Sequence, residues 1–255
     1  MQEREIAEKN MILKILVGSY LYGTETDDSD KDYLGVFIPD KDYVLGTKRV
    51  EQVEIRTNPT DSGHRNTKTD VDTVLYSLPK FIHLLTNNNP NILEVLFAPQ
   101  KNIIYCDRFG QMLLDNANLF VSKKLKYTFL GYAISQKKKL LFKNFEGGRK
   151  EVVEKNGYET KFASHIIRLL SEGIELLLSS RVNFPLEIAD QIRSIKQGKQ
   201  DLNYVLTYAD RLEQLVEQVF SKSTIPNTPD IEAINKLQIS MLELFWKIQK
   251  NASLL

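Results

Sequence analysis

Two aspartates, Asp30 and Asp32, stand just before an apolar segment and could together bind a divalent cation. Residues i and i+2 of a strand point to the same face, so both carboxylates would lie on one side. Glu25, Asp27 and Asp28 bring three more carboxylates into the same eight positions, where like charges repel unless water, protonation or a cation offsets them. Oxygen ligands in this pattern suit Mg²⁺, which keeps waters and completes its shell with substrate phosphates.

A Gly-Ser pair at positions 18 and 19 supplies the second half of a candidate phosphate site. Residues 11–17 read Met-Ile-Leu-Lys-Ile-Leu-Val, which is typical of a buried strand. Gly18 lets the backbone approach a ligand closely, and the amides of Gly18, Ser19 and Tyr20 could bind an anion or begin a short helix. The alternative is a plain turn followed by a solvated acidic loop. The Gly-Ser and Asp-x-Asp patterns together favour the phosphate and metal site.

A third carboxylate is expected from a neighbouring strand, because two cations that clamp the attacking and leaving oxygens of a phosphoryl transfer usually need three. Asp70 and Asp72 are the candidates, again at i and i+2. For either residue the alternative is an exposed position at the start of a strand.

A polar stripe is expected on the helix predicted over residues 161–179. Its members follow one another at helical spacing and share one face: Lys161, His165, Arg168 and Glu172. Cations on this face could hold a triphosphate and stabilise a leaving pyrophosphate. The alternative is the ordinary solvated face of an amphipathic helix.

A basic stretch occupies residues 123–155, where ten Lys and Arg residues stand against three Glu residues. Lys137, Lys138 and Lys139 form its densest run. Such a stretch could follow the phosphate backbone of a nucleic acid. A long helix with a solvated basic face is the alternative interpretation.

The composition is ordinary for a globular protein, with 42% hydrophobic and 26% charged residues among 255 and a net charge of +1. Cys106 is the only cysteine, which excludes an internal disulfide and a Cys-rich zinc site. The N-terminus is charged, and the apolar run at 11–17 is too short to span a bilayer. We therefore expect a cytoplasmic protein without a membrane partner.

Hydrophobic periodicity predicts an α/β part followed by helices. Strands are expected at 13–17, 32–38, 52–56, 71–76 and 102–105, with helices at 1–10, 78–85 and 91–97 and a mobile loop at 57–69. Further helices are expected at 108–116, 122–142, 161–179, 185–197, 201–221 and 229–250. Pro185 and Pro229 suit first helical turns, Thr228 suits an N-cap, and Gly147-Gly148 should break the helical pattern.

Residues 18–24 (Gly-Ser-Tyr-Leu-Tyr-Gly-Thr) and 29–39 (Ser-Asp-Lys-Asp-Tyr-Leu-Gly-Val-Phe-Ile-Pro) resemble the signature of the DNA polymerase beta nucleotidyltransferase superfamily. The resemblance is closer still to an uncharacterised family of predicted nucleotidyltransferases, some members of which are associated with RNA-repair gene sets. Further matching blocks lie at 76–81, 89–97 and 161–170, so the resemblance runs from about residue 12 to about residue 240.

This resemblance implies an α+β protein, with a catalytic nucleotidyltransferase domain of mixed sheet and flanking helices at 1–107. An all-α domain at 108–255 would close the cleft. The implied metal ligands for Mg²⁺ or Mn²⁺ are Asp30, Asp32 and Asp72, the last of which would also help to activate the acceptor hydroxyl. The implied nucleotide-binding residues are Gly18, Ser19, Lys161, His165 and Arg168. Phe162 stands where the family often has His, so no role of that His transfers here.

The implied reaction moves a nucleoside monophosphate from an NTP to an acceptor hydroxyl and releases pyrophosphate. RNA is the favoured acceptor, as a tRNA-like or damaged end, with Lys137, Lys138 and Lys139 as candidate contacts. Transfer to a protein side chain or a small molecule is a second hypothesis. A third is a nucleotide-binding module without catalysis, against which the three intact aspartates argue. The oligomeric state is left open.

Overall fold

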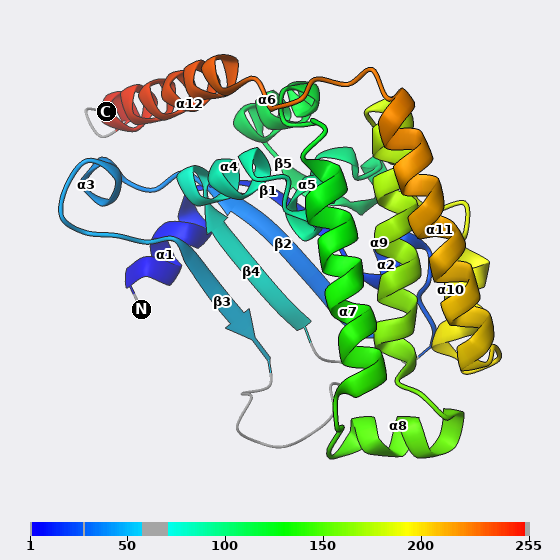
Figure 1. Ribbon diagram of the computed structural model, residues 1–255. Coiled ribbons are helices and arrows are strands. Elements are labelled where there is room, and N and C mark those ends of the chain that lie inside the picture. The colour runs from blue at the N-terminus through cyan, green and yellow to red at the C-terminus, as the bar shows by residue number, and fades with distance from the viewer. Residues whose placement is uncertain (1, 28, 58–70, 253–255) are drawn as a thin grey trace.

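A five-stranded sheet with helices packed around it forms the first part of the chain (Figure 1). The computed structural model describes residues 2–27, 29–57 and 71–252. The strands are β1 Met11–Leu16, β2 Lys31–Phe37, β3 Gln52–Arg56, β4 Val71–Ser77 and β5 Ile103–Cys106. The helices of this part are α1 Gln2–Lys9, α2 Ser19–Tyr22, α3 Lys41–Val44, α4 Leu78–Thr86 and α5 Pro90–Leu93. Each strand lies within two residues of its predicted bounds.

The sheet is mixed, with strand order β3-β4-β2-β1-β5. β2 and β4 are parallel neighbours, whereas the other neighbouring pairs are antiparallel. In the register of β2 and β4, Asp32 lies opposite Asp72. Because the two strands run in the same direction, both aspartates lie near the beginning of their strands, at the same edge of the sheet.

The second part of the chain is helical. Its helices are α6 Arg108–Asp115, α7 Gly131–Phe142, α8 Gly148–Asn156, α9 Thr160–Ser179, α10 Ala189–Lys196, α11 Leu202–Lys222 and α12 Ile231–Ala252. α9 packs between α7 and α11, and these three helices stand side by side next to the sheet (Figure 1). α12 returns to pack on α4, and its Trp246 Nε1 donates a hydrogen bond of 2.9 Å to the carbonyl of Pro39.

One hydrophobic core runs through both parts of the chain. It includes Ile15 of β1 and Phe81 of α4, and also Leu169 of α9 and Val205 of α11. A smaller cluster around Phe37 lies apart from this core and involves α1, α3, β3 and β4. The predicted fold of a mixed sheet with flanking helices followed by a helical region is confirmed, and the division into domains after residue 107 stays a prediction.

Two helices begin later than their prolines indicated. α10 begins at Ala189, because the amide of Leu186 donates to the carbonyl of Tyr22 over 3.1 Å and holds the preceding segment against α2. α12 begins at Ile231, and Asp230 rather than Thr228 accepts the capping hydrogen bond, from the amide of Ala233 at 3.0 Å.

The helix predicted over 122–142 is divided, and a further helix was missed. A π-helical segment, Lys126–Leu130, precedes α7, and it places the buried Phe129 against Gly173 of α9. Gly147, with φ of +57°, is the N-cap of α8. The Gly-Gly pair therefore marks the start of a helix as well as the predicted break in the helical pattern. The loop predicted over 57–69 lies outside the described residues from position 58 onward.

Candidate active site

The Gly-Ser turn at the end of β1 lies directly against Asp32. Gly18 has φ of +67° and ψ of −142°, a backbone conformation that is essentially restricted to glycine. A Cβ at this position would lie 2.9 Å from Asp32 Oδ2. α2 begins at Ser19, and the Gly18 carbonyl accepts hydrogen bonds from the amides of Leu21 and Tyr22 at 3.0 and 3.1 Å. The expected short helix is therefore present, while phosphate binding by this turn stays a prediction.

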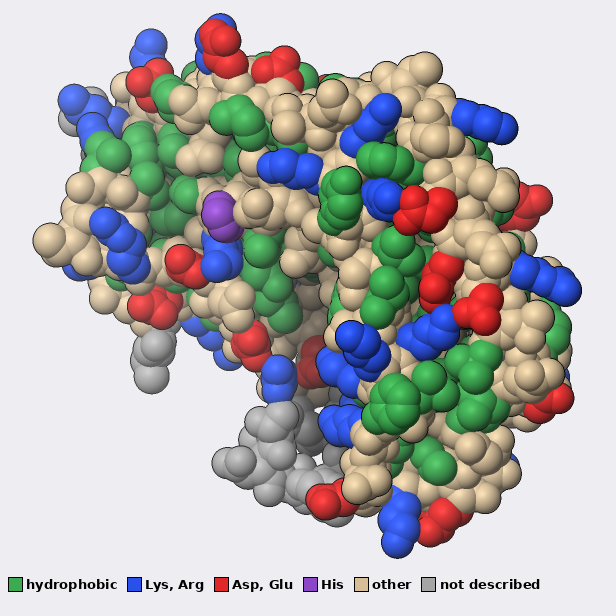
Figure 2. Space-filling view, in the orientation of Figure 1, with side chains coloured by type: hydrophobic (Ala, Val, Ile, Leu, Met, Phe, Trp, Pro, Cys, Tyr) green, Lys and Arg blue, Asp and Glu red, His purple; other side chains and the backbone are tan. Residues whose placement is uncertain are grey.

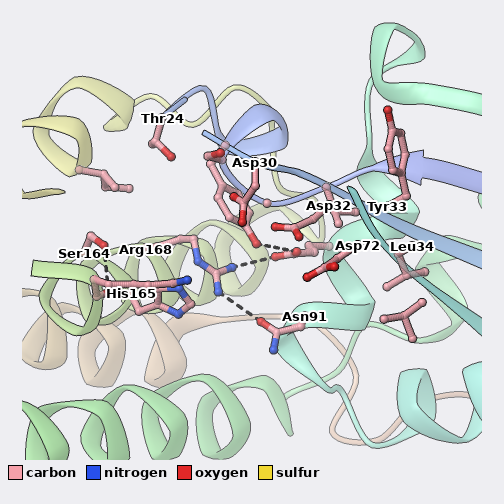
Figure 3. A pocket seen from close by; sticks show the side chains of 18 of the residues that line it. Thr24, Asp30, Asp32, Tyr33, Leu34, Asp72, Asn91, Ser164, His165 and Arg168 are labelled. Carbon is pink, nitrogen blue, oxygen red and sulfur yellow. Dashed lines mark hydrogen bonds and ion pairs between the residues drawn. The ribbon is translucent and has the colours of Figure 1, made fainter. Parts of the chain in front are cut away.

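A cavity of about 390 Å³ lies between this turn, β2, β4, α9 and α10, a size that suits a small ligand. Every residue predicted to bind metal or nucleotide lines it: Gly18, Ser19, Asp30, Asp32, Asp72, Lys161, His165 and Arg168. In Figure 3 the three aspartates lie on one side of the cavity and the side chains from α9 lie on the other. The structure therefore brings together segments that are more than 100 positions apart in the sequence.

The acidic side of the cavity consists of Asp30, just before β2, Asp32 in β2 and Asp72 in β4. The pKa of Asp32 is raised to about 6, chiefly by burial and also by the negative charges of Asp30 and Asp72, against the opposing effect of Lys161. Both burial and charge repulsion therefore disfavour the ionised form of Asp32, and a cation would favour it.

The carboxylate oxygens of these three aspartates suit Mg²⁺ or Mn²⁺ in their chemistry. Across the part of the chain that the structure describes, no three or more His, Cys, Asp or Glu side chains stand in an arrangement that could hold a metal ion. The three carboxylates share a cavity and would have to turn toward a common point to bind a cation. Metal binding stays a prediction.

The opposite side of the cavity carries two lysines from different helices. Lys161 lies in the first turn of α9, and Lys196 lies in the last turn of α10. Lys196 Nζ donates to the carbonyl of Thr24 over 3.3 Å. Burial lowers the pKa of Lys196, the charge of Lys161 lowers it further, and Asp30 acts in the opposite direction. Sequence reasoning missed Lys196, because only the packing of α10 on α9 brings it to Lys161.

His165 lies one turn after Lys161 on α9 and is partly buried in the cavity wall. Burial, together with the positive charges of Arg168 and the two lysines, lowers the pKa of His165 to about 3. The imidazole is therefore neutral near pH 7 and can donate or accept one hydrogen bond without adding charge.

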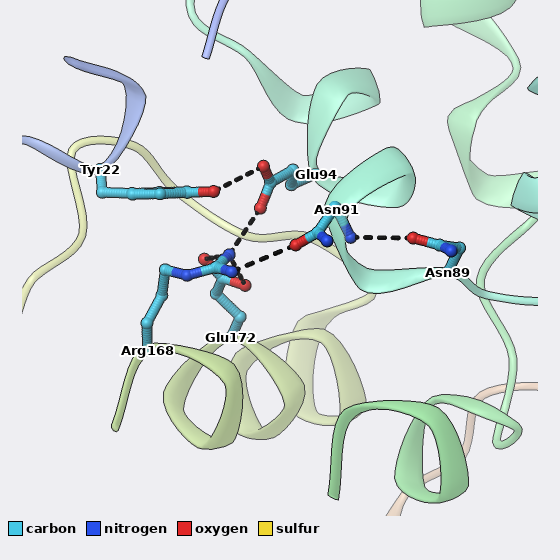
Figure 4. Close-up of polar contacts among 6 residues, drawn as sticks. All are labelled: Tyr22, Asn89, Asn91, Glu94, Arg168 and Glu172. Carbon is cyan, nitrogen blue, oxygen red and sulfur yellow. Dashed lines mark hydrogen bonds and ion pairs between the residues drawn. The ribbon is translucent and has the colours of Figure 1, made fainter. Parts of the chain in front are cut away.

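Arg168, in the wall of the cavity, lies at the centre of a buried polar network (Figure 4). Its Nη1 contacts Glu94 Oε2 at 2.8 Å and both carboxylate oxygens of Glu172 at 3.1 Å. Its Nη2 contacts Asn91 Oδ1 at 3.2 Å. The hydroxyl of Tyr22 donates to Glu94 Oε1 at 2.7 Å, and the guanidinium lies 4.4 Å from the centre of the Tyr22 ring.

This network engages most of the guanidinium of Arg168 inside the protein. Burial alone would lower the pKa of Arg168, but Glu172 and Glu94 hold it above its ordinary value. Burial in turn raises the pKa of both glutamates, which Arg168 opposes. The Nε of Arg168 is buried and has no hydrogen-bond partner among the described residues. Contact between Arg168 and a nucleotide stays a prediction.

The three lysines of the α7 run differ in their surroundings. Lys137 Nζ lies 2.5 Å from Asp210 Oδ1 and 2.9 Å from Glu213 Oε1, so it links α7 to α11. Lys138 and Lys139 are exposed and form no ion pair within the described part of the chain. Of the three predicted nucleic-acid contacts, these two present their charges to solvent.

Among the described residues, no helix is both long enough and apolar enough to cross a membrane.

Comparisons with known proteins bear on the identity of this site. A family model described as the RNA repair pathway DNA polymerase beta family matches residues 2–243. An uncharacterised 38.9 kDa protein from the nrdC-mobD intergenic region of Enterobacteria phage T4 is 34% identical over 131 residues. That region is 50% of this chain and 38% of the phage protein, so the chain spans well under half of its relative.

A solved nucleotidyltransferase-like protein from Exiguobacterium sibiricum 255-15 is similar over 96% of this chain and 75% of its own, at 13% identity and a TM-score of 0.31. The family model covers nearly the whole chain, including the Gly-Ser turn, the three aspartates and α9. The chain therefore belongs to the RNA repair pathway DNA polymerase beta family.

Proposed function

We propose that the protein transfers a nucleoside monophosphate from an NTP to a hydroxyl group of RNA, with Mg²⁺ or Mn²⁺ bound. Its family and fold point to a polymerase beta-like nucleotidyltransferase. The observation that carries the proposal is the division of one cavity into an acidic side, with Asp30, Asp32 and Asp72, and a side with two lysines. A metal-bound triphosphate needs both kinds of group at once.

In the proposed reaction, Lys161 and Lys196 hold the β- and γ-phosphates, and Ser19 binds them from the opposite side. The acceptor oxygen forms a bond to the α-phosphorus while the bond from that phosphorus to the bridging oxygen breaks. Pyrophosphate leaves, and its developing charge is stabilised by the two ammonium groups. Asp72 takes the proton of the acceptor hydroxyl. A metal held by the three aspartates would supply positive charge that offsets the phosphates.

The remaining cavity residues would orient the nucleotide. Neutral His165 can hydrogen-bond to it without repelling the lysines, and Arg168 would position the Gly-Ser turn through Tyr22. The apolar side chains in the cavity wall would pack against the base or the ribose: Leu34, Val74, Tyr76, Ile92 and Ile192.

RNA as the acceptor is supported by the description of the matched family and by the exposed Lys138 and Lys139. A cytoplasmic location agrees with the single cysteine. Transfer to a protein side chain or to a small molecule would use the same cavity.

The test is a transfer assay with each of the four NTPs labelled at the α-phosphate, Mg²⁺ or Mn²⁺, and cell extract as the source of acceptors. Asp30→Ala should abolish transfer, while Asp27→Ala, an exposed residue of the same acidic segment, should not. Asp30-dependent label that nuclease removes supports RNA as the acceptor. Label removed by protease would indicate that the acceptor is a protein and not RNA. Label that passes an ultrafiltration membrane would indicate a small-molecule acceptor. Equal labelling by Asp30→Ala, or none with any NTP, would overturn the proposed reaction.

A further inference from the structure

α7 and the residue that follows it expose hydrophobic and basic side chains together. Phe142 is 80% exposed, and Leu141 and Ile134 are 43% and 37% exposed. Lys138, Lys139 and Lys143 are exposed beside them. In Figure 2 hydrophobic and basic side chains gather over the C-terminal end of α7 and over the neighbouring α8. We call Ile134, Lys138, Lys139, Leu141, Phe142 and Lys143 the α7 face.

Helical spacing places the hydrophobic members and Lys138 on one side of α7, whereas Lys139 lies at the flank of that side and Lys143 follows the helix. Ile134, Lys138 and Phe142 are separated by four residues each, so their side chains follow one another along the helix. Lys137, one position away, turns instead to the carboxylates of α11. The three lysines of the α7 face form no ion pair in the residues that the structure describes, so their charges are directed to solvent.

The segment that follows α7 contacts α9, the helix that contributes Lys161 to the cavity. The ring of Phe145, which follows α7, lies 5.6 Å from that of Phe162 on α9, between centroids. The guanidinium of Arg149 on α8 lies 5.2 Å from the same Phe162 ring. Phe162 is adjacent to Lys161, which lines the cavity. Aromatic and basic side chains therefore join the segment after α7 to the first turn of α9, which contributes Lys161 to the cavity.

We propose that the α7 face binds single-stranded RNA, with a base stacked on Phe142 and phosphates against Lys138, Lys139 and Lys143. An exposed aromatic ring among exposed cations suits a strand whose bases are unpaired, because stacking and backbone charge are then satisfied together. A duplex hides its base faces, so Phe142 would gain little from it. The contact of the segment after α7 with α9 would let the bound strand present its end to the nucleotide. This inference rests on the proposed transfer to RNA, because the α7 face would hold the RNA that accepts the nucleotide.

The test measures the affinity for a fluorescent, unstructured RNA of about 12 nucleotides by anisotropy at several salt concentrations. Phe142→Ala should weaken binding about tenfold, because base stacking on an aromatic ring contributes about 1–3 kcal/mol. Phe142→Trp, which keeps a stacking surface, should retain the affinity. The double charge reversal Lys138→Glu/Lys139→Glu should weaken binding more than Phe142→Ala does. It should also lower the steepness of log affinity against log salt concentration by about 1.4, because two phosphate contacts are lost.

Matched controls lie elsewhere on the surface. Leu178→Ala also removes an exposed hydrophobic side chain, and Lys101→Glu/Lys222→Glu makes the same charge change away from α7. Both should leave RNA affinity within about twofold. Equal affinities of the α7 variants and these controls would overturn the inference, as would tighter binding of duplex RNA. A wild-type dimer that Phe142→Ala converts to a monomer would also overturn it, since the face would then bind a second copy.

Two further measurements separate this inference from the proposed reaction. NTP binding in the presence of Mg²⁺ should be unchanged in Phe142→Ala, because the α7 face lies outside the cavity lining. Asp30→Ala should lose transfer and keep RNA binding. Loss of transfer with all NTPs in the wild type, together with Phe142-dependent RNA binding, would reject the reaction and retain the α7 face.

Discussion

Arg168 Nη1 lies 2.8 Å from Glu94 Oε2, although the two residues are 74 positions apart. This buried ion pair joins α9 of the helical part to the 3₁₀ turn Glu94–Phe97 that follows α5. Tyr22 of α2 completes the link through its hydrogen bond to Glu94. The helix that carries Lys161 and the turn that carries Ser19 are therefore connected through one guanidinium, which fixes the two sides of the cavity relative to one another.

Removing this guanidinium should destabilise the protein strongly. Arg168→Met would leave Glu94 and Glu172 buried without their cation, which costs about 3–5 kcal/mol of unfolding free energy. Arg168→Lys should recover only part of the loss, since one ammonium group cannot reproduce the fork of contacts. Urea denaturation measures the difference, with the exposed Arg181→Met as the control, which should change stability by less than about 0.5 kcal/mol. A loss no larger than that of Arg181→Met would show that the network does not stabilise the fold.

Gly18→Ala should strongly impair nucleotide binding and activity, although it adds only one methyl group. The positive φ strains any other residue by about 1–3 kcal/mol, and the added Cβ would displace the Asp32 carboxylate that lies 2.9 Å away. Gly148→Ala is the matched control, because that position has open space around it and lies at the start of α8. NTP affinity and transfer rate should fall in Gly18→Ala and stay unchanged in Gly148→Ala. Equal rates in the two variants would contradict the close approach of Gly18 to the site.

Divalent metal should raise the melting temperature of the wild type more than that of Asp30→Asn. A ligand at about 100 times its Kd stabilises the native state by about 2.7 kcal/mol. Asp30→Asn also relieves charge repulsion near Asp32, which changes the melting temperature even without metal. The quantity to compare is therefore the change in melting temperature that metal causes in each protein. Calorimetry with Mg²⁺, Mn²⁺ and EDTA gives the metal-dependent difference. The same metal-dependent shift in both proteins would exclude Asp30 as a ligand.

His165 should make the protein less stable as the pH falls below 6.5. Its folded pKa of about 3 lies below the unfolded value, so the unfolded state binds more protons between these values and stability rises with pH there. The contribution reaches about 1.4 kcal/mol per pH unit. His165→Gln should therefore flatten the dependence of unfolding free energy on pH between 5 and 7, measured by urea denaturation at each pH. Parallel curves for the two proteins would contradict a buried neutral imidazole.

Much of the fold followed from local pattern. β3 occupies its predicted bounds, and the other strands lie close to theirs, because alternation and apolar runs reflect which residues must be buried. α10 and α12 began elsewhere than their prolines indicated, since the contact of Leu186 with Tyr22 and the capping by Asp230 decided the boundaries. Contacts between distant segments overrode the local preference there.

The sequence alone determined the chemical types at the site: the Gly-Ser turn, the spacing of Asp30 and Asp32, and the stripe on α9 that begins at Lys161. Only the tertiary structure decided which charges face the cavity and which are neutralised. Arg168 pairs with glutamates inside the protein, Lys137 pairs with α11, and Lys196 joins Lys161 across two helices. The physical reason is that burial and pairing depend on neighbours in space, and these neighbours are supplied by segments far apart along the chain.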